Sequence, residues 1–374
     1  MTPSIRLGRL FGIEIGANWS LIFIFALITW TLATSVLSVD VPGQSAGAYW
    51  LTAAAGAVIF YACLLAHEMS HALVARRSGV KVAGITLWLF GGVSRLDGEP
   101  SSAGSEALIA GVGPLTSFAI ALIAFGLAYV IPGNGLVPDL LSWLAFVNVA
   151  LGLFNLVPAF PLDGGRLLSS FFWWRSRSRQ RGVHNAVRVG RVFAFLMIAG
   201  GVLELFTGQV ASGIWIAFIG WFLLSAGASE DAGATIKAML RSVPVSAAMS
   251  SPVVVVPDWL TVGQFLESIA PQHSFTTYPV HEPSGKLTGV VRLSELVRVS
   301  SGERELKRLS DCARPISEVP VARPSDDLGA VVERLGGAVE QRILVFDQEK
   351  LVGIVAPIDL ARLMTVRQTL RTQP

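Results

Sequence analysis

The chain has 374 residues, of which 52% are hydrophobic and 15% are charged, and its mean hydropathy is +0.59. Soluble globular proteins carry roughly 25% charged residues, so this composition excludes an ordinary soluble enzyme. The net charge of +3 at pH 7 is too small to indicate a nucleic-acid partner. The two cysteines, Cys63 and Cys312, lie far apart in the chain and argue against a disulfide-stabilised scaffold.

The charged residues are divided unevenly along the chain. Residues 1–229 contain 13 Lys/Arg and 9 Asp/Glu, whereas the shorter stretch 230–374 contains 16 and 17. The first part has the charge density of a membrane domain, and the second that of a soluble domain. We therefore expect a polytopic α-helical membrane domain over residues 1–229, followed by a cytoplasmic α/β module.

Apolar segments of sufficient length to cross a bilayer, about 20 residues, are present in the first part. Six are expected, at roughly 18–38, 47–72, 105–131, 139–157, 192–207 and 213–229. The apolar stretch 83–94 is too short to span, and its β-branched and glycine residues predict a strand pair or a re-entrant element. Such an element is tolerated at membrane depth only where protein covers it.

Basic residues indicate how the segments are oriented. The loops 39–46, 132–138 and 208–212 contain no Lys or Arg. By the positive-inside rule, we expect a multi-pass protein of the cell membrane with both termini in the cytoplasm. The arginine-rich stretch 166–191 is expected to be a loop facing the lipid headgroups, with nucleic-acid binding as its alternative. The basic residues on the expected cytoplasmic side are Arg6, Arg9, Arg76, Arg77, Lys81, Arg166, Arg175, Arg177, Arg179, Arg181, Arg188 and Arg191.

The second apolar segment contains a cluster of ionisable residues, in the sequence LAHEMSH at 65–71. His67 and His71 are four residues apart and therefore share one face of a helix, where both imidazoles can bind a single Zn²⁺. Glu68 lies beside them, placed to accept a proton from water. Ionisable groups within a membrane are costly and usually functional. The alternative is three polar side chains satisfied by neighbouring helices.

A catalytic zinc needs a third protein ligand and an open position. The fourth apolar segment ends in FNLVPAFPLDGGR at 154–166, in which Pro158 and Pro161 interrupt the helix. Asp163 follows them, and its charge would be compensated if it bound a metal. Its alternative role is a helix cap at the membrane surface.

The combination of H-E-x-x-H in one segment and N-x-x-P-x-x-P-L-D-G in a later one resembles the site-2 protease family of intramembrane zinc metalloproteases. Phe90-Gly91-Gly92 is similar to the glycine-bearing hairpin of that family, and Gly113-Pro114-Leu115 to its Gly-Pro motif. The family often has an asparagine where this chain has Ser117, and we assign that position no role.

The resemblance implies one Zn²⁺ per chain, held by His67, His71 and Asp163, with Glu68 as the general base. It also implies that Asn155 donates to the oxyanion of the tetrahedral intermediate, with an interhelical amide hydrogen bond as its alternative role. The implied activity is the hydrolysis of peptide bonds in or near transmembrane segments of membrane proteins within the lipid bilayer, as in regulated intramembrane proteolysis.

A substrate peptide must be extended for its amide to be accessible. A strand edge at about 84–94 offers a place where such a peptide can add to a sheet. We expect the zinc site in the cytoplasmic half of the bilayer, because the two histidines lie within about two helical turns of Arg76 and Arg77.

The second part of the chain contains an internal repeat. Residues 243–300 and 308–366 share a β-α-β-β-α order and resemble a tandem pair of CBS (cystathionine-β-synthase-type) domains. The resemblance implies an adenine nucleotide in the clefts between the repeats and a homodimer formed through them. The hydroxyl residue of the family's ribose-binding pattern is replaced by Arg292 and Ala356. Asp359 is therefore open to two roles, ribose binding or an acid at a helix N-terminus.

Three functions remain to be distinguished. The first is an intramembrane zinc metalloprotease tuned by CBS domains, and the alternative is a CBS-gated membrane transporter or channel. Transporters place ionisable groups along a pathway, whereas here they are expected to converge on one zinc site. A third possibility is an inactive relative that only binds membrane segments.

Overall fold

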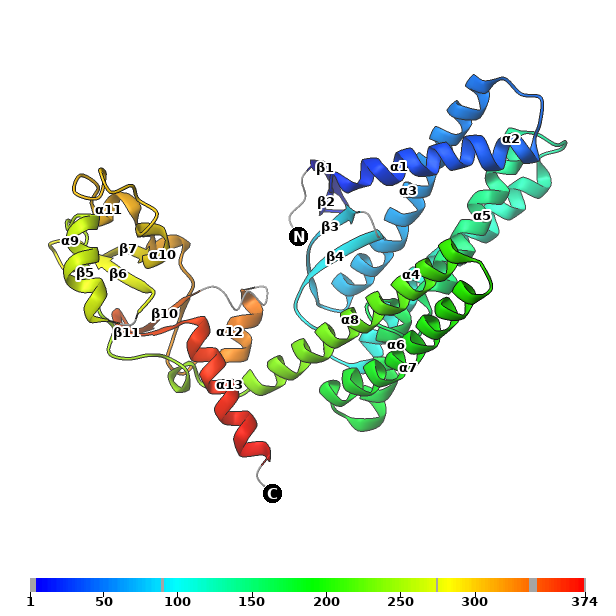
Figure 1. The fold of residues 1–374 in the computed structure, drawn as a ribbon. Helices are drawn as coiled ribbons and strands as arrows, with labels where there is room; N and C mark the ends of the chain where they lie inside the picture. The colour runs from blue at the N-terminus through cyan, green and yellow to red at the C-terminus, as the bar shows by residue number, and fades with distance from the viewer. Residues whose placement is uncertain (1–4, 89–90, 274, 336–341, 373–374) are drawn as a thin grey trace. The chain divides into compact units, whose positions relative to one another are not determined.

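The computed structural model describes residues 5–88, 91–273, 275–335 and 342–372. These residues form two compact units, 1–235 and 236–374 (Figure 1). Each unit has its own buried core, and each is described separately below.

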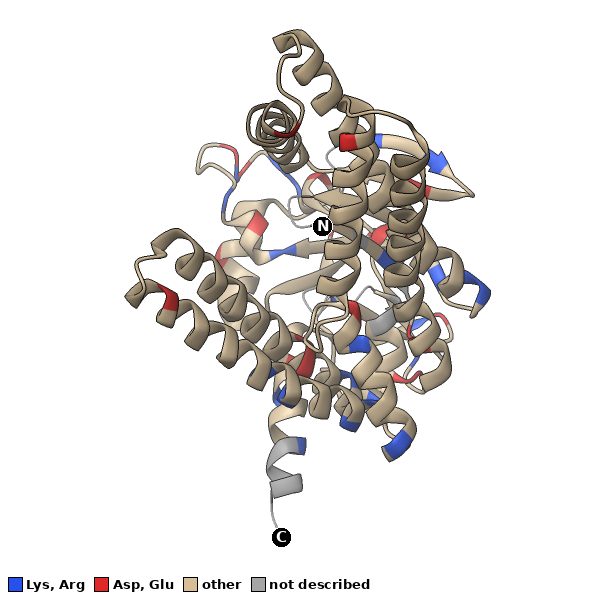
Figure 2. Cartoon of the chain, turned by 90° about the vertical axis from the view of Figure 1, so that its right-hand side faces the viewer, with Lys and Arg blue, Asp and Glu red and all other residues tan. Residues whose placement is uncertain are grey.

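The N-terminal unit contains long apolar helices, mostly without charged residues along their length (Figure 2). Among the described residues, six helical segments are long and apolar enough to cross a membrane, which confirms the expected polytopic helical fold. The first is made of α1 (Ser20–Thr31), a π-helical turn (Leu32–Val36) and α2 (Leu37–Asp40). The others are α3 (Ala46–Arg77), α4 (Ala103–Val130), α5 (Leu136–Asn155), α7 (Arg179–Phe206) and α8 (Val210–Leu240).

The arginine-rich stretch 166–191 is helical, so the expectation of a loop there is wrong. It forms most of α6 (Asp163–Ser176) and the first turns of α7. Arginine is a good helix former, and the chain turns only between the two helices, where Arg177 has a left-handed backbone with φ 52°. Ser178 then caps α7 by accepting a hydrogen bond from the backbone N–H of Arg181.

A four-stranded sheet packs beside α3. Its order is β1 (Ile5–Leu10), β2 (Ile13–Ala17), β3 (Lys81–Trp88) and β4 (Gly91–Asp97). β3 and β4 are the antiparallel pair expected at 83–94, although Phe90 of the glycine-bearing motif lies outside the described residues. The pairing of β2 with β3 in parallel was not expected. It brings the N-terminal strands into the sheet and leaves β4 at one edge.

The sheet is held against the helix that carries the HEMSH sequence. Buried isoleucine and leucine side chains of β2 and β3 pack on apolar side chains of α3, and burial of this kind stabilises the contact by roughly 25 cal/mol per Å² of apolar surface. This core contains Ile13, Ile15, Leu64, Met69, Ala72, Ile85 and Leu87.

The C-terminal unit contains two copies of one α/β pattern. The first copy has β5 (Val256–Pro257), α9 (Val262–Gln264) with a π-helical turn (Phe265–Ile269), β6 (Thr277–His281), β7 (Leu287–Arg292) and α10 (Leu293–Leu296). The second has β9 (Val321–Ala322), α12 (Leu328–Arg334), β10 (Ile343–Asp347), β11 (Lys350–Val355) and α13 (Pro357–Thr372). In each copy the first strand pairs parallel with the second, and the second pairs antiparallel with the third. The expected α/β fold class of this part is therefore confirmed.

The last membrane helix and the C-terminal unit are joined without a break in helical structure. α8 continues to Leu240, whose side chain is buried in the core of the second repeat with Val243, Val331 and Val345. Residues 231–240 are thus the end of this membrane helix.

Candidate metal centre

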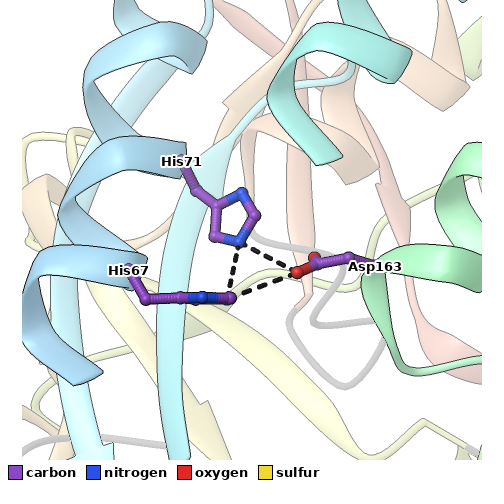
Figure 3. A group of neighbouring side chains, drawn as sticks. All are labelled: His67, His71 and Asp163. Carbon is purple, nitrogen blue, oxygen red and sulfur yellow. Dashed lines mark hydrogen bonds and ion pairs between the residues drawn. The ribbon is translucent and has the colours of Figure 1, made fainter. Parts of the chain in front are cut away.

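Three side chains from two helices meet at one point, as Figure 3 shows. His67 and His71 project from α3, and Asp163 is the first residue of α6. The two histidine Nε2 atoms are 3.1 Å apart. Oδ2 of Asp163 lies 3.3 Å from Nε2 of His67 and 3.1 Å from Nε2 of His71. Residues 92 positions apart in the chain are therefore brought within reach of one ion.

The Nδ1 atoms of both imidazoles contact residues of α4. Nδ1 of His71 lies 2.6 Å from the carbonyl oxygen of Ile109, and Nδ1 of His67 lies 2.9 Å from Oγ of Ser117. A carbonyl oxygen can only accept, so Nδ1 of His71 carries the proton and donates it. The hydroxyl of Ser117 can accept the corresponding proton of His67. In this arrangement both neutral rings present the lone pair of Nε2 to Asp163.

The donor set that results is suited to a cation. In these tautomers the two imidazole Nε2 atoms and a carboxylate oxygen face one another at about hydrogen-bond distance. Oδ2 of Asp163 is buried and receives no hydrogen bond from any described residue. Two histidines and a carboxylate are a common ligand set of catalytic zinc sites, with one position left for water. The residues present therefore fit the zinc ion that the sequence motifs imply.

Close approach of α4 depends on Gly113. A Cβ atom at this position would overlap the Nε2 atoms of both His67 and His71. Ile109, Gly113 and Ser117 follow one another at four-residue spacing and so line one face of α4. Ser117, to which no role was assigned from the sequence, lies on this face and contacts His67.

The chain around Asp163 is shaped by proline and glycine. α5 ends at Asn155, and the chain then turns back so that α6 begins at Asp163, a helix N-terminus where a carboxylate is favoured. The N-cap of α6 is Leu162, and no side chain caps the helix. Cβ atoms at Gly164 and Gly165 would strike the backbone of the preceding turn. Both positions therefore need glycine for α6 to start where it does.

Glu68 lies next to the three converging side chains, and its carboxylate has a different hydrogen-bond partner. Oγ of Ser94, on β4, donates a hydrogen bond of 3.0 Å to its Oε2. A Cβ atom at Gly92, on the same strand, would overlap the side chain of Glu68. The edge strand of the sheet thus reaches the polar centre of the membrane unit.

A cavity of about 500 Å³ adjoins this centre. It is lined by His67, Glu68, His71 and Asp163, and by aromatic residues of α8 such as Trp215 and Phe218. Asn155 also lines it, and its Nδ2 donates to the carbonyl oxygen of Leu151 one turn earlier in α5. An amide nitrogen carries two protons, so one donor of Asn155 is left over from this bond.

Comparison with known proteins identifies the family. The model of peptidase family M50 matches residues 55–137 and 133–198. Rip3 of Mycobacterium tuberculosis, whose name places it among the zinc metalloproteases, is 40% identical over 378 residues, covering 100% of this chain and 96% of Rip3. The chain belongs to peptidase family M50. It is an intramembrane zinc metalloprotease of the site-2 protease type, with the zinc ion that this family implies.

This M50 protease is also similar to two proteins of Methanocaldococcus jannaschii and to a bacterial CBS domain. Zinc metalloprotease MJ0392 of Methanocaldococcus jannaschii is 26% identical over 368 residues, covering 98% of this chain and 97% of that protein. The solved structure of the site-2 protease from the same organism covers 61% of this chain and 94% of its own, with 27% identity and a TM-score of 0.42. The C-terminal unit is similar to the CBS domain of a bacterial CNNM/CorC family Mg²⁺ transporter, which covers 36% of this chain and 82% of its own at 17% identity and a TM-score of 0.31.

Asp359 belongs to the C-terminal unit of the M50 protease. It lies in the first turn of α13 and is buried. Its Oδ1 accepts a hydrogen bond of 2.7 Å from Oγ of Ser250, and its Oδ2 accepts one of 2.8 Å from the backbone N–H of Ala356. A cavity of about 180 Å³ beside it is also lined by Thr276 and Arg342.

Proposed function

We propose that His67, His71 and Asp163 hold a single zinc ion in this M50 protease and that Glu68 is its general base. The observation that carries this proposal is the meeting of two imidazole Nε2 atoms with a buried carboxylate oxygen that receives no hydrogen bond from the described residues. When bound, zinc lowers the pKa of water to about 7 and polarises a carbonyl group.

Other side chains of the site transfer the proton, stabilise the oxyanion and orient the ligands. Glu68 takes the proton of the attacking water and returns it to the leaving amine, as general acid–base groups do. Asn155 directs its second amide proton into the cavity, toward the oxyanion that develops on the substrate carbonyl. The hydrogen bonds that His67 and His71 donate to α4 keep both rings in the tautomer that a metal requires.

The substrate is a transmembrane segment of another membrane protein, unwound into a strand. β4 is the last strand in the sheet order, so it has one edge unpaired by the other strands of the sheet. A peptide that pairs with this edge would have its amides exposed beside Glu68, and the main-chain hydrogen bonds would give affinity without a strict sequence requirement.

Both termini are proposed to be cytoplasmic, with the zinc site in the cytoplasmic half of the bilayer. His71 lies six residues before the end of α3 at Arg77, which is about 9 Å along the helix axis. Arg77 marks the level of the headgroups, so the site lies within reach of water from the cytoplasm.

The C-terminal unit is proposed to tune access to the cavity. α8 supplies aromatic residues to the cavity wall and continues unbroken to Leu240, in the core of the second repeat. A ligand that binds one arrangement of this unit more tightly can therefore shift the position of the cavity wall. The size of the shift in population is set by the difference in its affinity for the two arrangements.

The proposed ligand is an adenine nucleotide bound in the cavity beside Asp359. Arg342 offers a guanidinium group suited to phosphate, and each carboxylate oxygen of Asp359 has a second lone pair for a ribose hydroxyl. Homodimerisation through the same unit is part of this proposal. Calorimetry of the full-length protein with AMP, ADP and ATP tests the nucleotide, and light scattering of the detergent-solubilised protein tests the dimer.

Zinc content of purified protein tests the metal centre. The wild type should contain about one zinc per chain, and His71→Ala should lose it. His184→Ala is a matched control, because His184 pairs with Asp231 outside the site, and it should keep its zinc. Glu68→Gln should keep zinc and lose cleavage of a membrane substrate by about 10²–10⁴-fold. A zinc-free wild type would contradict the metal centre, and a Glu68→Gln variant that cleaves at the wild-type rate would contradict the role of Glu68 as the base.

A further inference from the structure

Ser94 connects the edge strand of the sheet to Glu68. Its hydroxyl donates a hydrogen bond of 3.0 Å to Oε2 of Glu68. Two residues earlier, Gly92 lies directly against the same side chain. Alternate residues of a strand face the same side, so both contacts come from one face of β4. The Glu68 side chain is thus confined by packing of Gly92 against its Cγ and Cδ atoms and by a donor at its carboxylate.

We propose that Ser94 is a positioning residue that holds the Glu68 carboxylate in the orientation needed to take a proton from the attacking water. This inference rests on the proposed role of Glu68 as the general base. Glutamate has a flexible side chain that loses rotamer freedom when it is ordered, and the adjoining cavity leaves it room to turn away. The hydrogen bond from Ser94 removes that freedom before the substrate arrives.

The position of Ser94 also links the base to substrate docking. β4 is the edge proposed to pair with the substrate strand, and it carries Ser94 on the face that meets Glu68. A peptide that pairs with β4 therefore orders the backbone of the strand that carries Ser94, and with it the hydrogen bond to Glu68. Loss of the hydroxyl leaves the pairing edge intact, so it should affect turnover and spare substrate binding.

The kinetic test separates these two quantities. Ser94→Ala should lower kcat by roughly 10- to 100-fold, the range expected for one lost hydrogen bond to a charged group, while KM changes by less than about twofold. Ser94→Thr keeps the hydroxyl and should restore kcat to near the wild-type value. The matched control is Thr86→Val on the neighbouring strand β3, since the Thr86 hydroxyl is buried and has no hydrogen-bond partner among the described residues. It should leave kcat unchanged.

A second readout does not depend on activity. In metal-free protein, Ser94→Ala should lower the melting temperature when Glu68 is present and have no effect in a Glu68→Ala background, because the two changes remove the same contact. Equal effects in both backgrounds would overturn the contact. Zinc content measured in parallel should stay at the wild-type level in every Ser94 variant, since no metal-binding side chain is altered.

Failure of this inference can be told apart from failure of the proposed base. If Glu68→Gln is inactive and Ser94→Ala has the wild-type kcat, the role of Ser94 is overturned and that of Glu68 stands. If Glu68→Gln is active, the base itself is wrong. A Ser94→Ala protein whose KM rises while kcat is retained would also overturn the positioning role. If Ser94→Ala does not fold, the kcat of Ser94→Thr decides: a value well below wild type contradicts the inference, and one near wild type supports it.

Discussion

Oγ of Ser117 lies 2.9 Å from Nδ1 of His67, a residue 50 positions earlier in the chain. The serine is fully buried in α4. A partner on the far nitrogen orients a histidine ligand, fixes its tautomer and raises its basicity. The contact therefore gives α4 a part in the proposed metal centre, although α4 contributes none of the three converging side chains.

Removing this hydroxyl should weaken zinc binding. We expect Ser117→Ala to lower zinc affinity by about 10- to 100-fold, because the imidazole of His67 loses the partner that holds its tautomer. Competition with a chelator of known affinity measures the change. Thr116→Ala is the neighbouring control, since among the described residues its hydroxyl bonds only to the carbonyl oxygen of Val112 in its own helix. Equal zinc affinities for the two variants would contradict the role of Ser117.

Gly113 should tolerate no side chain. Gly113→Ala places a methyl group where the Nε2 atoms of His67 and His71 lie, so α4 must move away from α3 and the three donors must separate. We expect loss of zinc and of cleavage. Gly111→Ala, two residues earlier in α4, meets only an ordinary contact with Leu167 and should keep both. Zinc content of the two purified variants makes the comparison, and full zinc in Gly113→Ala would refute this account of the packing.

The proposed orientation predicts the location of the loops. Reporter fusions after Asp40, Gly135 and Gly208 should score as extracytoplasmic, and a fusion after Arg179 should score as cytoplasmic. The reason is the absence of Lys and Arg from the first three regions and their concentration near the fourth. A cytoplasmic signal at Gly135 would reverse the assignment and move the zinc site to the other half of the bilayer.

Continuity of α8 should be needed for any effect of the C-terminal unit on cleavage. Inserting four glycine and serine residues after Thr235 interrupts the helix, because glycine disfavours helix by about 1 kcal/mol per residue. We expect basal cleavage and zinc content to persist while the response to a bound nucleotide is lost. Four inserted alanines, which keep the helix, are the control and should preserve more of the response. Nucleotide-dependent cleavage rates of both variants provide the measurement, and an undiminished response with the flexible insert would contradict coupling through α8.

Much of this protein can be predicted from its sequence alone. Apolar segments of membrane length, the local H-E-x-x-H spacing and the repeat in the second part depend on composition and on periodicities of a few residues. These features predict the helical membrane fold, the family and the α/β class of the C-terminal unit. His67 and His71 are neighbours on any helix that contains them, so their pairing needs no tertiary information.

The tertiary structure decided how distant residues are brought to the site and which further residues support it. Asp163 reaches the histidines because α5 is interrupted after Asn155 and the next helix begins where Gly164 and Gly165 allow close backbone contact. Ser117 and Ser94 contact His67 and Glu68 through packing of α4 and through the edge of the sheet, and neither contact has a short-range sequence signal. β2 and β3 pair in parallel although more than sixty residues separate them. This pairing depends on the burial of their apolar faces against α3. A strand's local preference does not select such a distant partner, because side-chain packing and burial decide it.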